Sequence, residues 1–434
     1  MKKVLSLAIA ASLMSGSVLA QDLAEIYQQA KETNPNLLKA EAVKESAFEA
    51  INESRASLLP QIDLTAGYNT SYTETDNAPI SGTSTTGALS AGVGLNQSIY
   101  NRANWINLDL AELNARESDT NYAVEQQQLI LDSATAYFDV LNATDNLRFT
   151  RAEKKAVGRQ LEQTKQRFEV GLSAITDVHD AQADYDSVLA DEIIAENNLI
   201  NSYEELREIT GIEYKKLDIL DTERFSVQPE KQSVAQLTKT AEEKNLSLLA
   251  SRISQDSAKT QITLAQSGHL PTLSFNADYG YNNPSDTDDT NSLTAGVNLA
   301  VPLYTGGAIT SQVKQAQHNF VSASEDLEAT QRAVIKNVRA SYNNINASIG
   351  SIRAYQQSVI SANSALEATE AGFEVGTRTI VDVLDSTRSL YDANSKLADA
   401  RYSYIINILN LKQAMGTLSE QDILDVNKGL KEAK

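Results

Sequence analysis

The stretch Leu89-Ser90-Ala91-Gly92-Val93-Gly94-Leu95 alternates apolar side chains with small ones, and the similar stretch Leu293-Thr294-Ala295-Gly296-Val297-Asn298-Leu299 follows 204 residues later. Alternation with a period of two is typical of a β-strand whose two faces meet different surroundings. Two more alternating stretches begin just after Pro60 and Pro271. The sequence therefore predicts four strands in two hairpins, with a polar loop from Glu74 to Gly87 between the strands of the first.

The two halves of the chain resemble each other well beyond these strands. Phe168-Glu169-Val170-Gly171, for example, recurs as Phe373-Glu374-Val375-Gly376. Several matches in the same order indicate an internal two-fold repeat. We expect a first repeat at 21–216, a connector at 217–231, a second repeat at 232–417 and a polar C-terminal tail at 418–434. Each repeat should hold a short helix, a strand hairpin (about 61–100; 272–304), a long helix (103–169; 308–374) and another helix (175–211; 380–416).

The N-terminus and the composition limit the compartment and the chemistry. Lys2 and Lys3 precede an apolar run and small residues near Ala20, which predicts a secretory signal peptide at 1–20. No later stretch approaches the ~20 apolar residues of a membrane-spanning helix, so any membrane crossing would use strands. The formal charge of -20 disfavours a nucleic-acid partner. No cysteine and three histidines leave few ligands, so we expect no metal, no cofactor and no enzymatic activity.

Alternation alone fits a membrane sheet and a sheet over a soluble core equally well. Two features favour the membrane. The segments reach the ~9 to 11 residues of a spanning strand, and their tyrosines gather toward the segment ends, as in aromatic girdles. These tyrosines are Tyr68, Tyr72, Tyr100, Tyr279, Tyr281 and Tyr304.

Four strands are too few to close a barrel, and an open sheet edge in lipid leaves backbone groups without partners. Several copies must therefore share one barrel. Two copies would give eight strands with a filled interior, whereas three would give twelve and a water path, so we favour a homotrimer. The proline-free segments 103–169 and 308–374 could each extend ~100 Å as helices with coiled-coil packing. The expected fold is an α+β membrane protein, a trimeric 12-stranded β-barrel (4 strands per chain) continued by a long α-helical barrel.

Several motifs strengthen this interpretation. Ser57-Leu58-Leu59-Pro60, Asn96-Gln97-Ser98-Ile99-Tyr100 and above all the segment from Val375 to Asp385 resemble those of the outer-membrane efflux proteins. The resemblance implies a channel-tunnel in the bacterial outer membrane that extends into the periplasm. It implies an exit duct for multidrug efflux and type I protein secretion. The implied partners are a periplasmic adaptor (membrane fusion) protein, an inner-membrane ABC or proton-driven pump, and outer-membrane lipid.

The turns between the paired helices are the expected entrance. Gly171 and Gly376 suit the left-handed turn that ends a helix. Beyond the second turn, Asp382 and Asp385 would each become three carboxylates in a trimer, and such rings attract cations. The alternative is an acidic first turn that only favours the helix dipole. The resemblance, which implies a cation-selective constriction here, favours the rings.

The resemblance also implies that weak bonds between hairpins hold the entrance closed. Arg378, whose counterpart in the first repeat is Ser173, is expected to pair with Asp177 on the neighbouring hairpin. Gln160 occupies another matching position. Phe373 stands where a tyrosine would donate a hydrogen bond, and a phenyl ring cannot donate one.

Two other functions compete with the duct. One is a trimeric surface or structural coiled-coil protein with a β-barrel anchor, against which the internal repeat argues. The other is a periplasmic hydrolase that uses paired aspartates, but the sequence offers no nucleophile with a neighbouring base.

Overall fold

The computed structural model describes residues 21–77 and 80–432. The signal peptide expected at 1–20 lies outside the described residues. The chain forms two compact units. The first comprises 1–38, 125–245 and 334–434, and the second comprises 39–124 and 246–333, in each case as far as the structure describes them. Each unit therefore takes segments from both halves of the chain.

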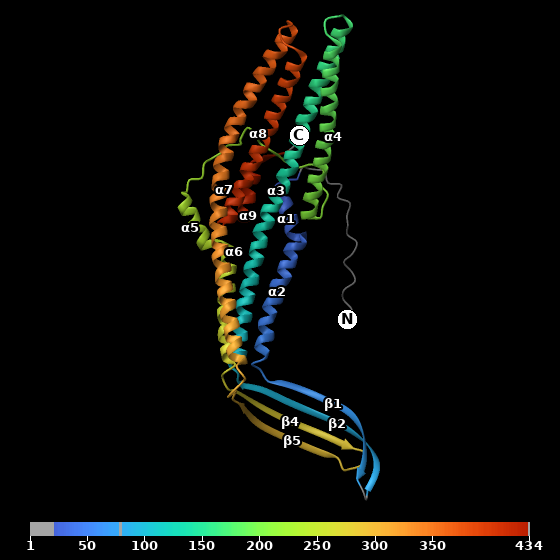
Figure 1. Cartoon of the computed structure of the whole chain (residues 1–434), viewed down its shortest axis with the longest axis vertical. Coiled ribbons are helices and arrows are strands. Elements are labelled where there is room, and N and C mark those ends of the chain that lie inside the picture. Colours follow the sequence, from blue (N-terminus) through green and yellow to red (C-terminus); the bar gives the residue numbers. More distant parts are fainter. Residues whose placement is uncertain (1–20, 78–79, 433–434) are drawn as a thin grey trace. The chain divides into compact units, whose positions relative to one another are not determined.

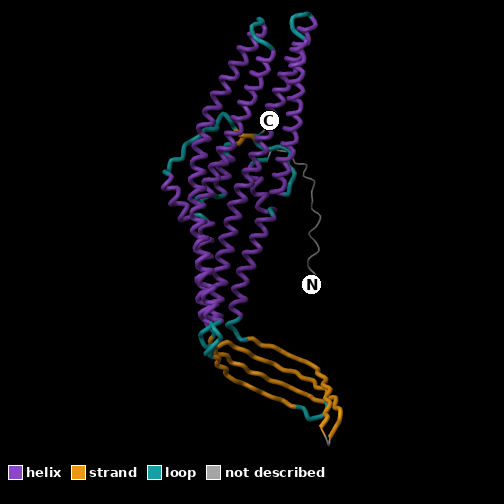
Figure 2. Tube along the Cα trace, in the orientation of Figure 1, coloured by secondary structure: helices purple, strands orange, loops and turns teal. Residues whose placement is uncertain are grey.

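The second unit contains a four-stranded antiparallel sheet (Figures 1 and 2). Its strands are β1 (Gln61–Asn77), β2 (Ile80–Tyr100), β4 (Thr272–Pro284) and β5 (Thr290–Ala300), in the order β1-β2-β4-β5. Pairing of β2 with β4 joins the two hairpins, and Leu95 faces Ile62 on one side and Ala277 on the other. β1 and β5 are therefore the outer strands.

The first hairpin is longer than its polar sequence indicated. The segment from Glu74 to Gly87, expected as a loop, continues β1 to Asn77 and resumes as β2 from Ile80. Threonine and serine dominate this segment, and threonine is favoured in strands because of its branched side chain. In the second hairpin β5 ends at Ala300, before the expected end near 304, and Pro302 beyond it has no N–H for a ladder.

Large apolar side chains of the sheet are exposed. Leu64 is 80% exposed and Leu293 is 77% exposed. A sheet that covered a soluble core would bury such side chains. The described part of the chain therefore leaves this apolar face uncovered. Other exposed members of the set are Ile62, Tyr68, Tyr72, Leu89, Val93, Tyr279, Val297 and Leu299.

The two short helices are each broken, although one helix was expected in each place. α1 (Leu23–Thr33) and α2 (Pro35–Ala56) meet at Asn34, and α5 (Val234–Lys244) and α6 (Leu246–Ser267) meet at Asn245. Both asparagines are extended, with ψ of 121° and 124°. Asn34 precedes a proline, which disfavours helical backbone. Each asparagine also donates its side-chain amide to the end of a longer helix, Asn34 to the Ile209 carbonyl (3.1 Å) and Asn245 to the Ala414 carbonyl (2.9 Å).

The long helices have nearly the expected bounds. They are α3 (Arg102–Glu169), α4 (Ile175–Thr210), α7 (Ala308–Glu374) and α8 (Ile380–Ala414). α3 turns into α4 and α7 turns into α8, which makes two helical hairpins (Figure 1). Within 21–77 and 80–432, no helix has the length and apolar character that crossing a bilayer requires.

The connector and the C-terminal segment both pack in the first unit. The tail, for which only polar character was expected, forms α9 (Glu420–Asn427) and β6 (Leu430–Lys431). β6 pairs with β3 (Ile219–Leu220) of the connector. Farther along the connector, the Tyr404 hydroxyl of α8 accepts from the Gln228 N–H (2.9 Å) and donates to the Gln228 carbonyl (3.0 Å). These contacts attach the connector to α8 and to the chain end.

Candidate functional site

Near the tips, the two helical hairpins share one apolar core, here called the tip core. It joins α3, α4 and α8, with side chains of α7 packed against it. Its members lie within the last turns of α3 and α7 and the first turns of α4 and α8. They are Val157, Leu161, Ala181, Val188, Ile380, Val383 and Leu384, with Tyr185, Leu366 and Phe373 against them.

The two tip turns have the predicted conformation. Gly171 and Gly376 have φ of +77° and +76°, which other residues adopt only with strain. The following N–H groups reach back to the helix ends, Leu172 to the Arg167 carbonyl (2.8 Å) and Thr377 to the Gly372 carbonyl (2.9 Å). These bonds satisfy carbonyls that a helix end otherwise leaves free.

Asp382 caps α8. The Thr379 N–H and hydroxyl both donate to its carboxylate, at 2.8 and 2.9 Å, and the Asp382 N–H donates to the Thr379 hydroxyl (3.3 Å). These bonds from Thr379, and the charge of Arg378 to a smaller degree, lower the pKa of Asp382. Asp382 therefore takes part in the N-terminal capping box of α8, in addition to any role in an entrance ring. Asp385 lies one turn farther along α8, with an exposed side chain.

Within the described chain, Arg378 and Asp177 each have a partner on their own hairpin. Arg378 Nη1 lies 3.9 Å from Asp382 Oδ1, one turn along the same segment. Asp177 accepts from the Ser173 hydroxyl (2.6 Å) and from the Ala174 N–H (3.1 Å), and so caps α4. The link between Arg378 and Asp177 stays a prediction.

Gln160 connects the two hairpins. Its side-chain amide donates to the Thr387 hydroxyl of α8 at 3.1 Å, and the two side chains are buried in the tip core region. Thr387 in turn donates to the Val383 carbonyl (2.8 Å). The Gln160 amide oxygen is buried and has no hydrogen-bond partner among the described residues.

Phe373 also contacts the other hairpin. The Arg167 guanidinium carbon lies 4.6 Å from the centre of the Phe373 ring, so a cation from α3 covers an aromatic face from α7. Such a contact needs no hydroxyl. Phe373 therefore contacts the other hairpin without a tyrosine hydroxyl. Sequence reasoning missed it because Arg167 and Phe373 are distant in the chain.

A second contact missed by sequence reasoning joins Arg388 of α8 to Asp184 of α4. The two side chains form an ion pair in which Arg388 Nη2 donates to Asp184 Oδ1. The Asp184 side chain is only 12% exposed. Neither residue has a charged equivalent in the other repeat, since Ser389 and Ala183 stand there. Comparison of the repeats therefore carried no signal for this pair.

Polar contacts continue along the helices away from the tips. The Asn142 amide donates to the Asp399 carboxylate (3.2 Å) and the Tyr402 hydroxyl donates to the Asp145 carboxylate (2.8 Å). The Ser395 hydroxyl also donates to the Asn146 side chain. Together these contacts hold α3 against α8 below the tip core.

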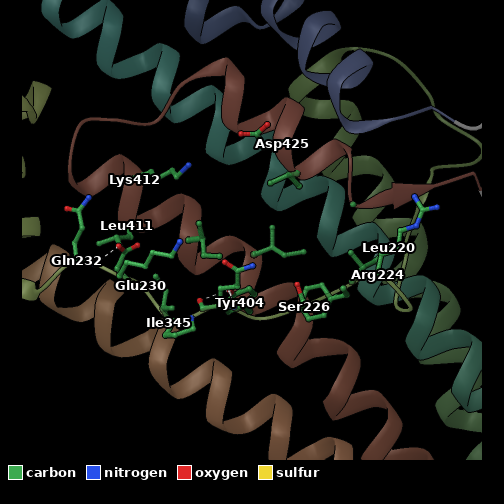
Figure 3. A pocket seen from close by; sticks show the side chains of 18 of the residues that line it. Leu220, Arg224, Ser226, Glu230, Gln232, Ile345, Tyr404, Leu411, Lys412 and Asp425 are labelled. Carbon is green, nitrogen blue, oxygen red and sulfur yellow. Dashed lines mark hydrogen bonds between the residues drawn. The ribbon is translucent and has the colours of Figure 1, made fainter.

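The connector borders a pocket of about 610 Å³ in the first unit (Figure 3). Apolar side chains of α8 and the connector, such as Ile405, Leu411 and Phe225, line most of it. None of the predicted entrance residues lies there. Among the residues that the structure describes, no group of three or more His, Cys, Asp or Glu could hold a metal ion.

Comparison with known proteins identifies the family. The profile described as "Outer membrane efflux protein" matches residues 26–212 and 237–417. "Outer membrane protein TolC" of Vibrio cholerae is 60% identical over the whole of both chains. "Proteases secretion protein PrtF" of Dickeya chrysanthemi is 26% identical and covers 98% of this chain and 94% of its own.

A solved structure agrees with the fold. The CmeC outer membrane channel of Campylobacter jejuni has a TM-score of 0.82 at 18% identity, and covers 98% of this chain and 95% of its own. The chain belongs to the outer membrane efflux protein family. The predictions of this family, of an efflux function and of an outer-membrane location are thereby confirmed. The relatives are channel proteins, not enzymes.

Proposed function

We propose that the chain is the outer-membrane exit duct of an efflux and type I secretion machine. Family membership and the similarity to TolC and to a protease secretion protein support both roles. The single observation that carries the proposal is the exposed apolar face of the four-stranded sheet. Large side chains such as Leu64 gain the transfer free energy of burial only when lipid covers them.

The duct would be a homotrimer. β1 and β5 are outer strands with one neighbour each, so β5 of one copy can pair with β1 of the next. Three copies close a 12-stranded barrel with no open edge in the bilayer. A further support is α4, whose Ile193, Ile194 and Ile200 are 62%, 58% and 61% exposed. A neighbouring copy would cover these side chains in a helical barrel.

The helical barrel would be built from two similar halves of each chain. The hydrogen bonds of Asn34 and Asn245 support this duplication, because each joins the break in a short helix to the end of a longer one. In each half, the broken short helix and the second helix of the hairpin would stack end to end. Together they would form a column beside the long helix. Four columns per chain match four strands per chain.

The helical tips would form the periplasmic entrance. In a trimer, Asp382 and Asp385 of α8 make two rings of three carboxylates, which would select cations. Contacts between hairpins, including that of Gln160, the ring contact of Phe373 and the predicted pair of Arg378 with Asp177, would keep the entrance closed. An exposed ion pair contributes only ~0 to 1 kcal/mol, so several such contacts are needed. An inner-membrane pump with its periplasmic adaptor would open the entrance by shifting this balance.

Two measurements on the detergent-solubilised protein test the proposal. Light scattering coupled to size-exclusion chromatography should give the mass of three chains. Planar bilayers should show single channels that prefer cations. A trimer that never conducts would favour a structural coiled-coil protein with a barrel anchor. A monomer that stays soluble without detergent would contradict both.

A further inference from the structure

The ion pair of Arg388 and Asp184 lies between the helical hairpins and not at their tips. Asp184 lies nine residues into α4, which corresponds to ~14 Å along the helix from Ile175. Arg388 lies at a similar depth in α8. One Asp184 oxygen binds Arg388, while Oδ2 is buried and has no hydrogen-bond partner among the described residues. A carboxylate in this setting depends strongly on its single cation, since little water replaces it.

Acidic side chains from three helices lie near the ion pair, and each interacts with Asp184 or with Glu153. Glu153 of α3 is partly buried and interacts with Arg388 and Asp184. Asp191 of α4 and Asp392 of α8 also act on Glu153. The Tyr391 hydroxyl interacts with Glu153, and also with Arg159 and Glu370. Asp385 interacts electrostatically with Asp184. Glu153 and Asp184 thus both interact with the guanidinium of Arg388, whereas Asp392 pairs with Lys396 at 2.7 Å.

We propose that Arg388 and Asp184 fasten the two hairpins to each other below the tips, and that protonation of Glu153 strengthens this fastening. The proposal rests on the proposed function, in which separation of the hairpins opens the entrance. The pair is suited to this role because its partners come from different hairpins, in contrast to Arg378 and Asp382, which share one segment. The two residues would position the helices and need not touch the transported substance.

The sign of the pH effect follows from the position of Glu153. Burial raises the pKa of Glu153 to about 7 from an ordinary value of 4.5; Arg388 opposes this shift and Asp184 adds to it. When the hairpins separate, water reaches Glu153 and its pKa falls back toward the ordinary value. The closed form therefore holds the proton more tightly. Closure is favoured at pH below the ordinary value and is lost as pH rises through about 7.

The physical cause is competition for Arg388. Protonated Glu153 is neutral and leaves the guanidinium to Asp184. Ionised Glu153 competes for Arg388 and repels Asp184, Asp191 and Asp392 across the helix contacts. A single proton held in this way changes the ratio of closed to open form by at most tenfold per pH unit. With a pKa of about 7 in the closed form and 4.5 in the open form, we expect roughly a 30-fold change between pH 5.5 and 8.

The separation of the hairpins can be measured directly in the full-length protein. The chain has no cysteine, so spin labels can be attached at Leu172→Cys and Val375→Cys, whose native side chains are 70% and 75% exposed at the two tips. Pulsed electron resonance then gives the distance between the tips. Arg388→Ala should shift the distribution toward longer distances, with a roughly threefold to tenfold larger open fraction. Arg207→Ala is the matched control, because Arg207 is similarly exposed but pairs with Glu204 on its own helix.

Charge exchange separates the ion pair from general damage. Asp184→Arg and Arg388→Asp should each open the tips, and the double exchange should restore the closed distribution. For the pH arm, the native chain should open between pH 5.5 and 8, whereas Glu153→Gln should stay closed throughout. Glu162→Gln, on an exposed side of the same helix, should open like the native chain.

Three results would overturn the proposal: tips unaffected by Arg388→Ala, a double exchange that stays open, or a pH response unchanged by Glu153→Gln. None of these readouts requires conduction. A native channel that is silent in planar bilayers would therefore contradict the proposed function alone, while the distances would still decide whether the ion pair joins the hairpins.

Discussion

The Gln160 side chain of α3 donates a 3.1 Å hydrogen bond to the Thr387 hydroxyl of α8, and this bond joins two residues that are 227 positions apart. Gln160 is 7% exposed and Thr387 is fully buried. A buried bond between neutral groups is worth about 1 kcal/mol, and removal of one partner leaves the other unsatisfied. The bond therefore opposes separation of the two hairpins.

Thr387→Val should weaken closure. Valine keeps the shape of threonine but removes the acceptor, so the Gln160 amide loses its bond at a cost of about 1 to 2 kcal/mol. We expect a larger open probability of single channels in planar bilayers. Thr150→Val is the control, because the Thr150 hydroxyl donates to the Asn146 carbonyl of its own helix (3.0 Å) and not to the other hairpin. Equal open probability of the two variants would show that the bond has no part in closure.

Arg167→Ala should also open the entrance, because it removes the cation above the Phe373 ring. The expected loss is about 0.5 to 1 kcal/mol at this partly exposed position. Phe373→Leu should have a similar effect, and the double variant should add little to either. Fully additive effects on open probability would mean that the two side chains act independently.

Arg378→Ser should raise single-channel conductance if Arg378 links neighbouring hairpins as predicted. Serine is the residue at the equivalent position of the first repeat, Ser173. The pair that Arg378 makes with Asp382 is long and exposed, so its loss should barely change stability. Unchanged conductance would exclude Arg378 from the closing contacts.

Asp385→Asn should reduce the preference for cations, because it would remove three carboxylates from a trimeric entrance. Asp382→Asn should do so as well. Since bonds from Thr379 lower the pKa of Asp382, its contribution to selectivity should persist at pH values at which an ordinary aspartate is protonated. Reversal potentials under a salt gradient measure the effect. Asp186→Asn, at an exposed position of α4, is the control. An equal loss of cation preference in this variant would argue against a localised ring.

Tyr404→Phe should destabilise the attachment of the connector. The variant removes both hydrogen bonds to Gln228 while it keeps the ring contact with Phe225, whose centroid lies 6.0 Å away. We expect a loss of about 1 to 2 kcal/mol, visible as a lower Tm of the purified protein. Tyr279→Phe, at an exposed position of the sheet, should leave Tm nearly unchanged. Identical Tm values would show that these bonds contribute nothing.

Local features of the sequence predicted the local structure well. The bounds of the long helices and the glycine turns at Gly171 and Gly376 follow from proline-free stretches and from residues that tolerate positive φ. The breaks at Asn34 and Asn245 were missed, although Pro35 was a signal for the first. The strands of the first hairpin were predicted too short near Asn77, because Ser and Thr are found in loops and in strands alike.

The sequence by itself determined the alternating strands, the long helices and the family, since each depends on residues within a few turns or on a motif read along the chain. Only the tertiary structure decided which side chains meet between the hairpins. Arg167 with Phe373, and Arg388 with Asp184, are side chains from different hairpins, and nothing local distinguishes them from other charged or aromatic residues. The physical reason is that contact across two packed helices depends on their axial register and rotation, which the packing of the tip core sets.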